Sequence, residues 1–329
     1  MTAPLLSVRH LRVEFPTRRA TLHALDDVSF DIMAGEVLGM VGESGAGKSV
    51  TGAAIIGLID PPGRIAGGEI LLDGQRIDNL PAEALRRIRG KRIGMVFQDP
   101  LTSLDPLYRI GDQLQETIAT HTDLRGAALR RRAVALLAEV GIPAPDIRID
   151  NFPHQFSGGM RQRVVLALAL AAEPELVIAD EPTTALDVSV QAQIIALMKR
   201  LARDHRVAIM LITHDMGVVA EAADRVAVMY AGRIVEIGPV RDVVHAPQHP
   251  YAKGLMGSIP KLDGDADRLV QIPGAMPRLH AIPSGCAFHP RCPSAFSPCL
   301  ARRPDLRPHG PGSVACWLHD EAAPTERGP

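Results

Sequence analysis

A glycine-rich segment at residues 42–49 restricts the folds open to this chain more than any other stretch. It reads GESGAGKS and matches the pattern GxxxxGK[ST] without a mismatch. A strand predicted at Glu36–Val41, around the apolar run Val37–Val41, precedes it, and a helix is predicted to follow. Glycines let the backbone curl so that several N–H groups converge on one anion, and the helix N-terminus adds a favourable dipole. The sequence therefore predicts a strand, a phosphate-binding loop and a helix, in this order.

We expect the phosphate-binding loop to hold a nucleotide. Lys48 would neutralise charge on the β- and γ-phosphates, and Ser49 would ligate Mg²⁺. The alternative, a glycine-rich turn that matches by accident, leaves the flanking strand and helix unexplained. The residues assigned to nucleotide binding here are Gly42, Glu43, Ser44, Gly45, Ala46, Gly47, Lys48, Ser49 and Val50.

Two adjacent acids follow another apolar run, Leu176–Ala179. A buried parallel strand delivers its C-terminal residues to the sheet edge where the phosphate-binding loop is expected. Asp180 is then placed to hold Mg²⁺, and Glu181 to act as general base or to position the attacking water. The alternative is that the two acids only form a turn at the end of the strand, which is common where no phosphate-binding loop is present.

Two polar residues also follow predicted strands. Gln98 comes after Ile93–Phe97 and can reach both the metal and the nucleophilic water. His214 comes after Val207–Thr213 and can hydrogen-bond the γ-phosphate. Lone polar residues at strand ends are usually loop residues, but their order along the chain favours catalytic roles for both. Gln98 is also assigned to the nucleotide and to Mg²⁺.

The sequence FSGGMR at residues 156–161 precedes an apolar segment, Val164–Ala172, that predicts a buried helix. A serine, two glycine N–H groups and a helix N-terminus would form a second anion-binding cap. Because the chain already has one phosphate-binding loop, we expect this cap to contact the ATP of a neighbouring subunit. The alternative is a simple N-cap turn. The residues assigned to this role are Ser157, Gly158, Gly159 and Met160.

Short apolar runs separated by helical patterns such as Ser189–Leu201 indicate an α/β fold with a parallel sheet covered on both faces. Leu6–Phe30 alternates more regularly and predicts an antiparallel edge sheet. Residues 100–160 are poor in strand signals and predict an inserted helical subdomain. The buried strands expected are Val37–Val41, Ile93–Phe97, Leu176–Ala179, Val207–Thr213 and Val226–Tyr230.

Composition divides the chain near residue 240. About half of its 27 prolines lie in residues 241–329. We expect a nucleotide-binding domain at 1–240, a linker at 241–260 and a loop-rich C-terminal region at 261–329. The formal net charge of −1 gives no support to nucleic-acid binding. No apolar run reaches the ~18 residues of a membrane span, and the N-terminus lacks the pattern of a secretory signal. The expected location is therefore the cytoplasm.

The four cysteines all lie in the C-terminal region, at Cys286, Cys292, Cys299 and Cys316. In a reducing cytoplasm this clustering argues against disulfides and for metal or reactive-thiol chemistry. Four thiolates can hold a [4Fe–4S] cluster or a tetrahedral Zn²⁺ ion, although the paired C-x2-C spacing usual for zinc is absent. A cross-link of this kind would stabilise a proline-rich segment that has few apolar residues. A cluster, zinc and free thiols all remain open.

Together, these motifs resemble the nucleotide-binding subunits of ABC transporters over residues 5–240. The resemblance implies ATP and Mg²⁺ as cofactors and a dimer that sandwiches each ATP between the phosphate-binding loop of one subunit and the FSGGM segment of the other. It implies that Phe15 packs against adenine. The corresponding family motifs are Walker A at Gly42–Ser49, the Q-loop at Gln98, the signature at Phe156–Met160, Walker B ending at Asp180, the catalytic Glu181, the D-loop Ala185-Leu186-Asp187 and the switch His214.

The signature departs from the common LSGGQ and resembles one branch, the ATPases of oligopeptide/dipeptide permeases. The segments Gln98–Pro106 and His249–Lys253 and the cysteine tail resemble the same branch. This resemblance implies import of di- or oligopeptides, with nickel and glutathione importers as the alternative, and it favours a [4Fe–4S] cluster at the four cysteines. The implied partners are a second ATPase subunit, favoured as a different chain, two transmembrane permease subunits and an extracytoplasmic binding protein. The implied location is the cytoplasmic face of the inner membrane.

A soluble ABC ATPase of DNA repair or translation is the rival class. Repair ATPases separate the two ATP-binding motifs by long coiled coils, and this chain has no sustained heptads between Lys48 and Ser157. Translation ATPases usually carry two ATPase units in one chain, whereas this chain has one. We therefore expect no nucleic-acid partner.

Overall fold

The computed structural model describes residues 3–184, 186–258 and 271–320. The chain divides into two compact units, each built from several stretches of sequence. The first unit contains the N-terminal residues through Leu5, Ile32–Val37 and Asn79–Ile212. The second unit contains Leu6–Asp31, Leu38–Asp78 and the chain from Thr213 onward.

A parallel three-strand arrangement forms the centre of the first unit. Strand β7 (Leu176–Asp180) pairs in parallel with β6 (Ile93–Val96) on one side and with β8 (Ala208–Thr213) on the other. Every residue of β7 and β8 is buried, which explains why these strands are continuous apolar runs rather than alternating ones. The predicted strands at these positions are confirmed, with ends shifted by one residue.

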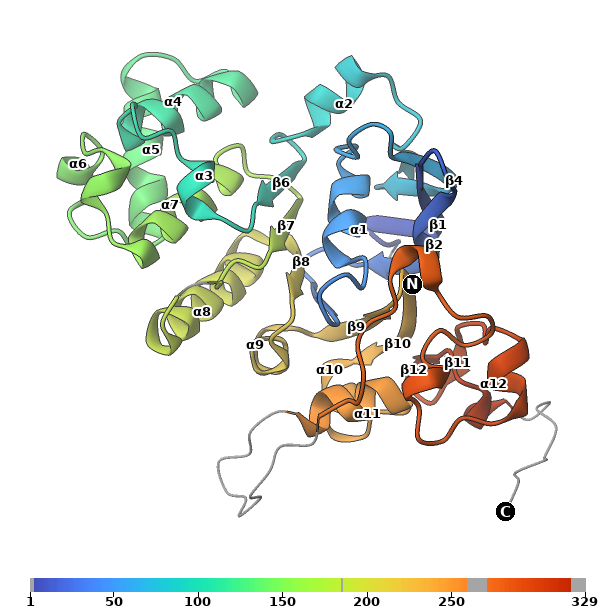
Figure 1. Cartoon of the computed structure of the whole chain (residues 1–329). Coiled ribbons are helices and arrows are strands. Elements are labelled where there is room, and N and C mark those ends of the chain that lie inside the picture. The colour runs from blue at the N-terminus through green and yellow to red at the C-terminus, as the bar shows by residue number, and fades with distance from the viewer. Residues whose placement is uncertain (1–2, 185, 259–270, 321–329) are drawn as a thin grey trace. The chain divides into compact units, whose positions relative to one another are not determined.

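Helices make up most of the rest of the first unit, and α3 to α7 gather in one group (Figure 1). In α8 the apolar positions predicted from their spacing, Ile194 to Leu201, form the buried face. Helices α4, α5 and α7 contact one another, and α7 begins directly after Ser157. The bounds are α2 Ala82–Ile88, α3 Pro100–Ser103, α4 Ile110–His121, α5 Ala127–Glu139, α6 Pro145–Arg148, η1 Pro153–Gln155, α7 Gly158–Leu170 and α8 Val188–His205.

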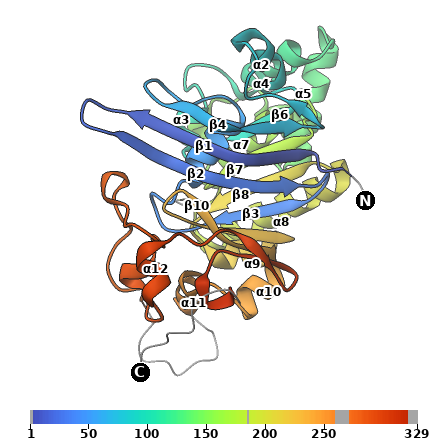
Figure 2. The same cartoon turned by 90° about the vertical axis from the view of Figure 1, so that its right-hand side faces the viewer.

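Two sheets organise the second unit. The antiparallel sheet predicted near the N-terminus is confirmed, with the order β2-β1-β4-β5 and three long strands side by side (Figure 2). In the other sheet, β3 runs parallel to β9, and β10 runs antiparallel to β9, so the sheet is mixed. The bounds are β1 Leu6–Pro16, β2 Thr21–Ile32, β3 Val37–Val41, α1 Lys48–Ile55, β4 Arg64–Leu72, β5 Gln75–Arg76, α9 Met216–Ala222, β9 Arg225–Tyr230 and β10 Arg233–Pro239.

The chain after β10, which we call the C-terminal region from here on, adds to the second unit (orange to red in Figure 1). Strand β12 pairs antiparallel with β10 and with β11, so this region extends the mixed sheet. The bounds are α10 Val240–His245, α11 Pro250–Gly257, η2 Leu279–Ala281, η3 His289–Arg291, α12 Ser297–Ala301, β11 Arg307–His309, β12 Gly312–Val314 and η4 Trp317–His319.

We expected a linker at 241–260. Its described part, through Ser258, contains most of α10 and all of α11, and Tyr251 and Ala252 of α11 are fully buried. These two side chains of α11 therefore belong to the core of the second unit. Residues 259–260 of the expected linker, and residues 261–270 and 321–329 of the expected C-terminal region, lie outside the described residues, and the domain boundaries remain a prediction.

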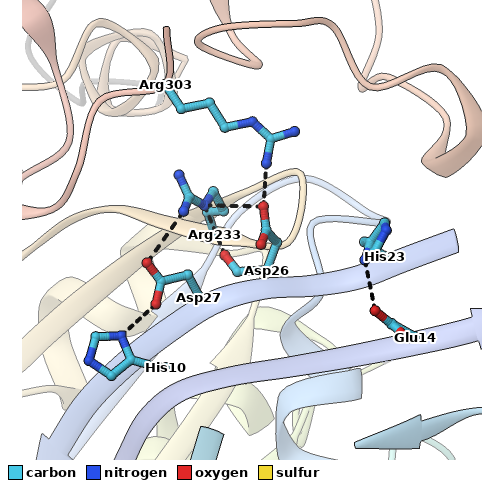
Figure 3. A network of polar contacts seen from close by, with 7 residues as sticks. All are labelled: His10, Glu14, His23, Asp26, Asp27, Arg233 and Arg303. Atoms are coloured by element: carbon cyan, nitrogen blue, oxygen red, sulfur yellow. Dashed lines mark hydrogen bonds and ion pairs between the residues drawn. The ribbon is translucent and has the colours of Figure 1, made fainter. Parts of the chain in front are cut away.

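A polar network ties the C-terminal region to β2 (Figure 3). Arg303 donates a hydrogen bond to the carboxylate of Asp26, and Arg233 donates to the Asp26 carbonyl oxygen at 2.8 Å. Arg233 also forms an ion pair with Asp27. The other carboxylate oxygen of Asp27, Oδ1, lies 2.7 Å from His10 Nδ1. Most of these side chains are partly exposed, so each ion pair contributes little to stability.

None of the helices in the described part of the chain is long and apolar enough to cross a membrane.

Candidate functional site

The phosphate-binding loop has the backbone geometry that only glycine allows. Gly42 has a φ of +152°, and a Cβ there would lie 2.3 Å from the carbonyl oxygen of Met229. Gly47 has a φ of +107° and forms the N-cap of α1. The loop therefore joins β3 to α1 in a turn that directs N–H groups of the helix start toward one point.

Lys48 and Ser49 open helix α1 at the end of this turn. Lys48 is buried, and its Nζ donates hydrogen bonds to the carbonyl oxygens of Gly42 and Glu43 at 2.8 and 3.2 Å. Ser49 is exposed. The ammonium group of Lys48 thus lies inside the curl of the loop, where a phosphate would meet it.

Glu43 is held from outside the loop. Its N–H donates to the hydroxyl of Tyr251 at 2.8 Å, and its carboxylate pairs with Arg291 at 2.6 and 2.9 Å. This N–H therefore points away from the concave side of the loop, where the phosphates are expected. Sequence reasoning missed Tyr251 and Arg291, because neither lies in a nucleotide-binding motif.

Phe15 lies in β1 and is half-buried. Its ring lies against Gly63, where an added Cβ would come within 2.5 Å of the ring. A contact between Phe15 and adenine stays a prediction.

The acid pair lies where β7 ends. Asp180 is 7% exposed, and the N–H of Glu181 donates to the carbonyl oxygen of Ile212 at 2.8 Å. Glu181 has a φ of +47°, in the left-handed region that residues with a Cβ rarely adopt. Such local strain is concentrated at functional sites, because it fixes the direction of a side chain.

The structure brings Gln98 and Glu181 together. Glu181 Oε2 accepts hydrogen bonds from Gln98 Nε2 at 3.3 Å and from Thr184 Oγ1 at 2.8 Å. Thr184 was not predicted as a site residue, although its place three residues after Glu181 in the turn that follows the strand allows this contact. The proposed base is therefore held by two side chains of the first unit.

The signature segment forms the start of α7. Ser157 is the N-cap, and its hydroxyl accepts a hydrogen bond from the N–H of Met160 at 3.3 Å. Ser157 and Gly158 are exposed, while Phe156 is 3% exposed and anchors the segment in the core. The N-cap turn and an exposed helix N-terminus are thus both present, and the contact to a neighbouring subunit stays a prediction.

His214 directly follows β8 and is exposed. The next residue, Asp215, caps α9 by accepting hydrogen bonds from the N–H groups of Gly217 and Val218 at 2.8 and 3.2 Å. The strand end and this cap fix the backbone around His214. Of the expected D-loop, Ala185 lies outside the described residues, and Asp187 caps α8 by accepting from the N–H of Val190 at 2.9 Å.

The phosphate-binding loop and His214 belong to the second unit, while the acid pair, Gln98 and the signature belong to the first. The distances given above are all within one unit or the other. That all of them meet around one nucleotide stays a prediction.

The four cysteines line one small cavity, together with Phe288 and Trp317. Burial raises the pKa of Cys286 to about 11 and that of Cys316 to about 12. All four thiols thus border the same cavity. Among the described residues, however, no group of three or more His, Cys, Asp or Glu side chains is arranged to hold a metal ion.

Comparison with known proteins gives two family matches along the chain. The ABC transporter family matches residues 25–184, and the oligopeptide/dipeptide transporter C-terminal region matches residues 235–299. The dipeptide transport ATP-binding protein DppD of Bacillus subtilis is 48% identical over 97% of this chain and 96% of its own length. The oligopeptide transport ATP-binding protein OppD of Escherichia coli is 48% identical over 95% of this chain and 93% of its own length.

Solved structures agree with these matches. The dimeric, post-hydrolysis structure of the ATP-binding cassette MJ0796 bound to ADP and Pi has a TM-score of 0.65 and 27% identity. It covers 72% of this chain, and the match spans 99% of the cassette. The predicted fold, an ABC nucleotide-binding domain with a cysteine-containing C-terminal extension, is therefore confirmed.

Proposed function

Because this chain belongs to the family of ABC transporter ATP-binding proteins with an oligopeptide/dipeptide transporter C-terminal region, we propose that it hydrolyses ATP to drive the import of di- or oligopeptides. The observation that carries this proposal is the near-complete coverage of the chain by dipeptide and oligopeptide relatives at 48% identity. The match includes the C-terminal region as well as the ATPase core. The same relatives favour peptides over nickel or glutathione as cargo.

ATP is held in this proposal by the phosphate-binding loop, with Lys48 against the β- and γ-phosphates. The hydroxyl of Ser49, the carboxylate of Asp180 and the amide oxygen of Gln98 are hard oxygen donors of the kind Mg²⁺ prefers. Bound Mg²⁺ would neutralise charge on the phosphates. Glu181 takes the proton of the attacking water, and His214 donates to the γ-phosphate. The hydrogen bonds from Gln98 and Thr184 to Glu181 support this role, since a base must be held in one orientation.

A second ATPase subunit completes each site. Ser157–Met160 contacts the partner's ATP through the N-terminus of α7, and the exposure of Ser157 and Gly158 supports this. The MJ0796 cassette, whose solved structure is a dimer, is consistent with it. Closure of the dimer would move two permease subunits between inward- and outward-facing states at the cytoplasmic face of the inner membrane. A different chain as the second ATPase, and a binding protein that delivers cargo, complete the proposed complex.

Ser157 allows a test of the contact to the partner's ATP that leaves the helix cap in place. Asp and Asn both serve as N-caps as well as Ser does. We expect Ser157→Asp to lower ATP turnover by about tenfold or more, because its carboxylate would face a phosphate, while Ser157→Asn retains most of the activity. ATP turnover of the full complex and thermal unfolding of both variants are the measurements. Equal turnover in the two variants would show that the cap faces no phosphate.

The cargo can be assigned by uptake into proteoliposomes that contain the complete complex. Labelled dipeptide, oligopeptide, glutathione and Ni²⁺ are offered separately, each with the binding protein and internal ATP. We expect accumulation of peptides alone. Accumulation of only Ni²⁺ or glutathione would keep the ATPase role and overturn the cargo.

For the cysteine cavity we propose a [4Fe–4S] cluster held by Cys286, Cys292, Cys299 and Cys316. The presence of all four cysteines in the lining of one cavity supports it. When bound, such a cluster would cross-link a proline-rich segment. The thiols would have to lose their protons to ligate iron, and bound iron would favour the thiolate form despite the raised pKa values of Cys286 and Cys316.

Metal analysis of anaerobically purified protein tests the cluster. We expect about four irons and four sulfides per chain, and their loss in Cys299→Ser, which changes one ligand atom. The control is the unfolding temperature of the same variant, which should fall with the iron content. Stoichiometric zinc, or protein without metal but of full stability, would contradict the cluster.

A further inference from the structure

We infer that Arg291 and Tyr251 of the C-terminal region are positioning residues for the phosphate-binding loop, and that they set the affinity for ATP by holding Glu43. This inference rests on the proposed ATPase function and concerns the same site. Both residues lie far from the loop in sequence, and both reach the second residue of the loop.

Glu43 is held through each of its polar groups. Its N–H donates to Tyr251 Oη at 2.8 Å, and its carbonyl oxygen accepts from Lys48 Nζ at 3.2 Å. Its carboxylate forms two hydrogen bonds with Arg291, at 2.6 and 2.9 Å. One residue thus connects the proposed phosphate-binding lysine to the C-terminal region.

Arg291 is itself fixed. Its side chain is 6% exposed, and its Nε donates to the carbonyl oxygen of Pro273 at 2.8 Å. The guanidinium carbon lies 5.9 Å from the ring centres of both Tyr230 and Phe288. A planar cation with this many fixed contacts holds a carboxylate in one position, which lysine could not do equally well.

Tyr251 is fixed as well. It is fully buried, and its ring packs edge-on against Tyr230 at 4.6 Å between centres. Its N–H donates to Nδ1 of His249, the N-cap of α11, and the His249 N–H donates to the buried carboxylate of Glu236 at 2.8 Å. The hydroxyl that meets Glu43 is therefore held by α11 and β10, not by the loop.

The charges predict the direction of the effect. Paired with Arg291, the carboxylate of Glu43 is neutralised beside a loop that binds the anionic phosphates of ATP. Without Arg291, a half-buried negative charge would remain next to those phosphates and repel them. The loop binds the phosphates in the ground state and in the transition state, so the loss should raise Kd and KM for ATP with little change in kcat.

The test compares Arg291→Met with Glu43→Gln/Arg291→Met in the complete transporter. Binding is measured with a fluorescent ATP analogue, and KM and kcat by ATP hydrolysis. We expect Arg291→Met to raise Kd and KM about tenfold or more, and the double variant to recover most of that loss because the repelling carboxylate is gone. Arg303→Gln is the matched control, since it removes a cation of the same region that pairs with Asp26 instead.

The inference is overturned if Arg291→Met leaves Kd unchanged, if the double variant binds ATP no better than the single one, or if kcat falls as much as KM rises. Tyr251→Phe gives a second test should Arg291→Met not fold, because it keeps the buried ring and removes only the hydroxyl. It should raise KM severalfold at unchanged kcat, and an unchanged KM would contradict the role of Tyr251. A wild-type complex that binds no ATP would instead overturn the proposed function.

Discussion

Replacing Glu181 with Gln is expected to lower ATP turnover by about 10²- to 10⁴-fold while ATP binding is retained, because a general base contributes a factor of this size. The amide keeps the shape of the side chain and its hydrogen-bond acceptor for Gln98 and Thr184, but it cannot take a proton from water. The measurement is steady-state hydrolysis by the complete complex, together with the Kd for a fluorescent ATP analogue.

Glu181→Asp is the matched control, since it keeps the carboxylate but shortens its reach. Its turnover should fall between those of the wild type and Glu181→Gln. Because ATP stays bound without being hydrolysed, the Glu181→Gln complex should also remain in the closed dimer longer. Unchanged hydrolysis by Glu181→Gln would remove Glu181 from the role of base.

Replacing Lys48 with Met is expected to weaken ATP binding by about 2–5 kcal/mol, roughly 30- to 5,000-fold in Kd. The ammonium group is buried within the loop and contacts the carbonyl oxygens of Gly42 and Glu43. Methionine keeps an unbranched apolar stem like that of lysine but lacks the terminal ammonium group, whose charge neutralises the phosphates. Titration with the fluorescent ATP analogue measures the effect.

The control for this change is the stability of the protein without nucleotide. Met fits the stem of Lys48, so the unfolding temperature without ATP should change little, while stabilisation by added ATP is lost. If ATP stabilised Lys48→Met as much as it stabilises the wild type, Lys48 would not contact the phosphates.

The ATPase core could be predicted from the sequence because its signals are local. Strand β3 is a run of apolar residues directly before a glycine-rich loop, and the predicted range Val37–Val41 is the observed one. At β6 the predicted end at Phe97 was one residue too late, and this ring is 48% exposed. An apolar side chain after a strand looks the same in sequence whether it is buried or not.

The C-terminal region could not be predicted in this way. Its prolines predicted a loop-rich tail from residue 241 onward, but they gave no sign that His249 and Tyr251 are buried. Burial lowers the pKa of His249 to about 3. The contact of Arg291 with Glu43 joins residues 248 positions apart. Neither residue type nor spacing reveals such a pair, because it depends on how distant segments pack.

The central claim is that this chain couples ATP hydrolysis to peptide import. The most direct measurement is the rate of ATP hydrolysis by the complex in proteoliposomes, with and without binding protein loaded with peptide. The account predicts that peptide-loaded binding protein raises the rate in the wild type and leaves Glu181→Gln inactive. A wild-type rate that is the same with and without permeases and loaded binding protein would contradict coupling to transport.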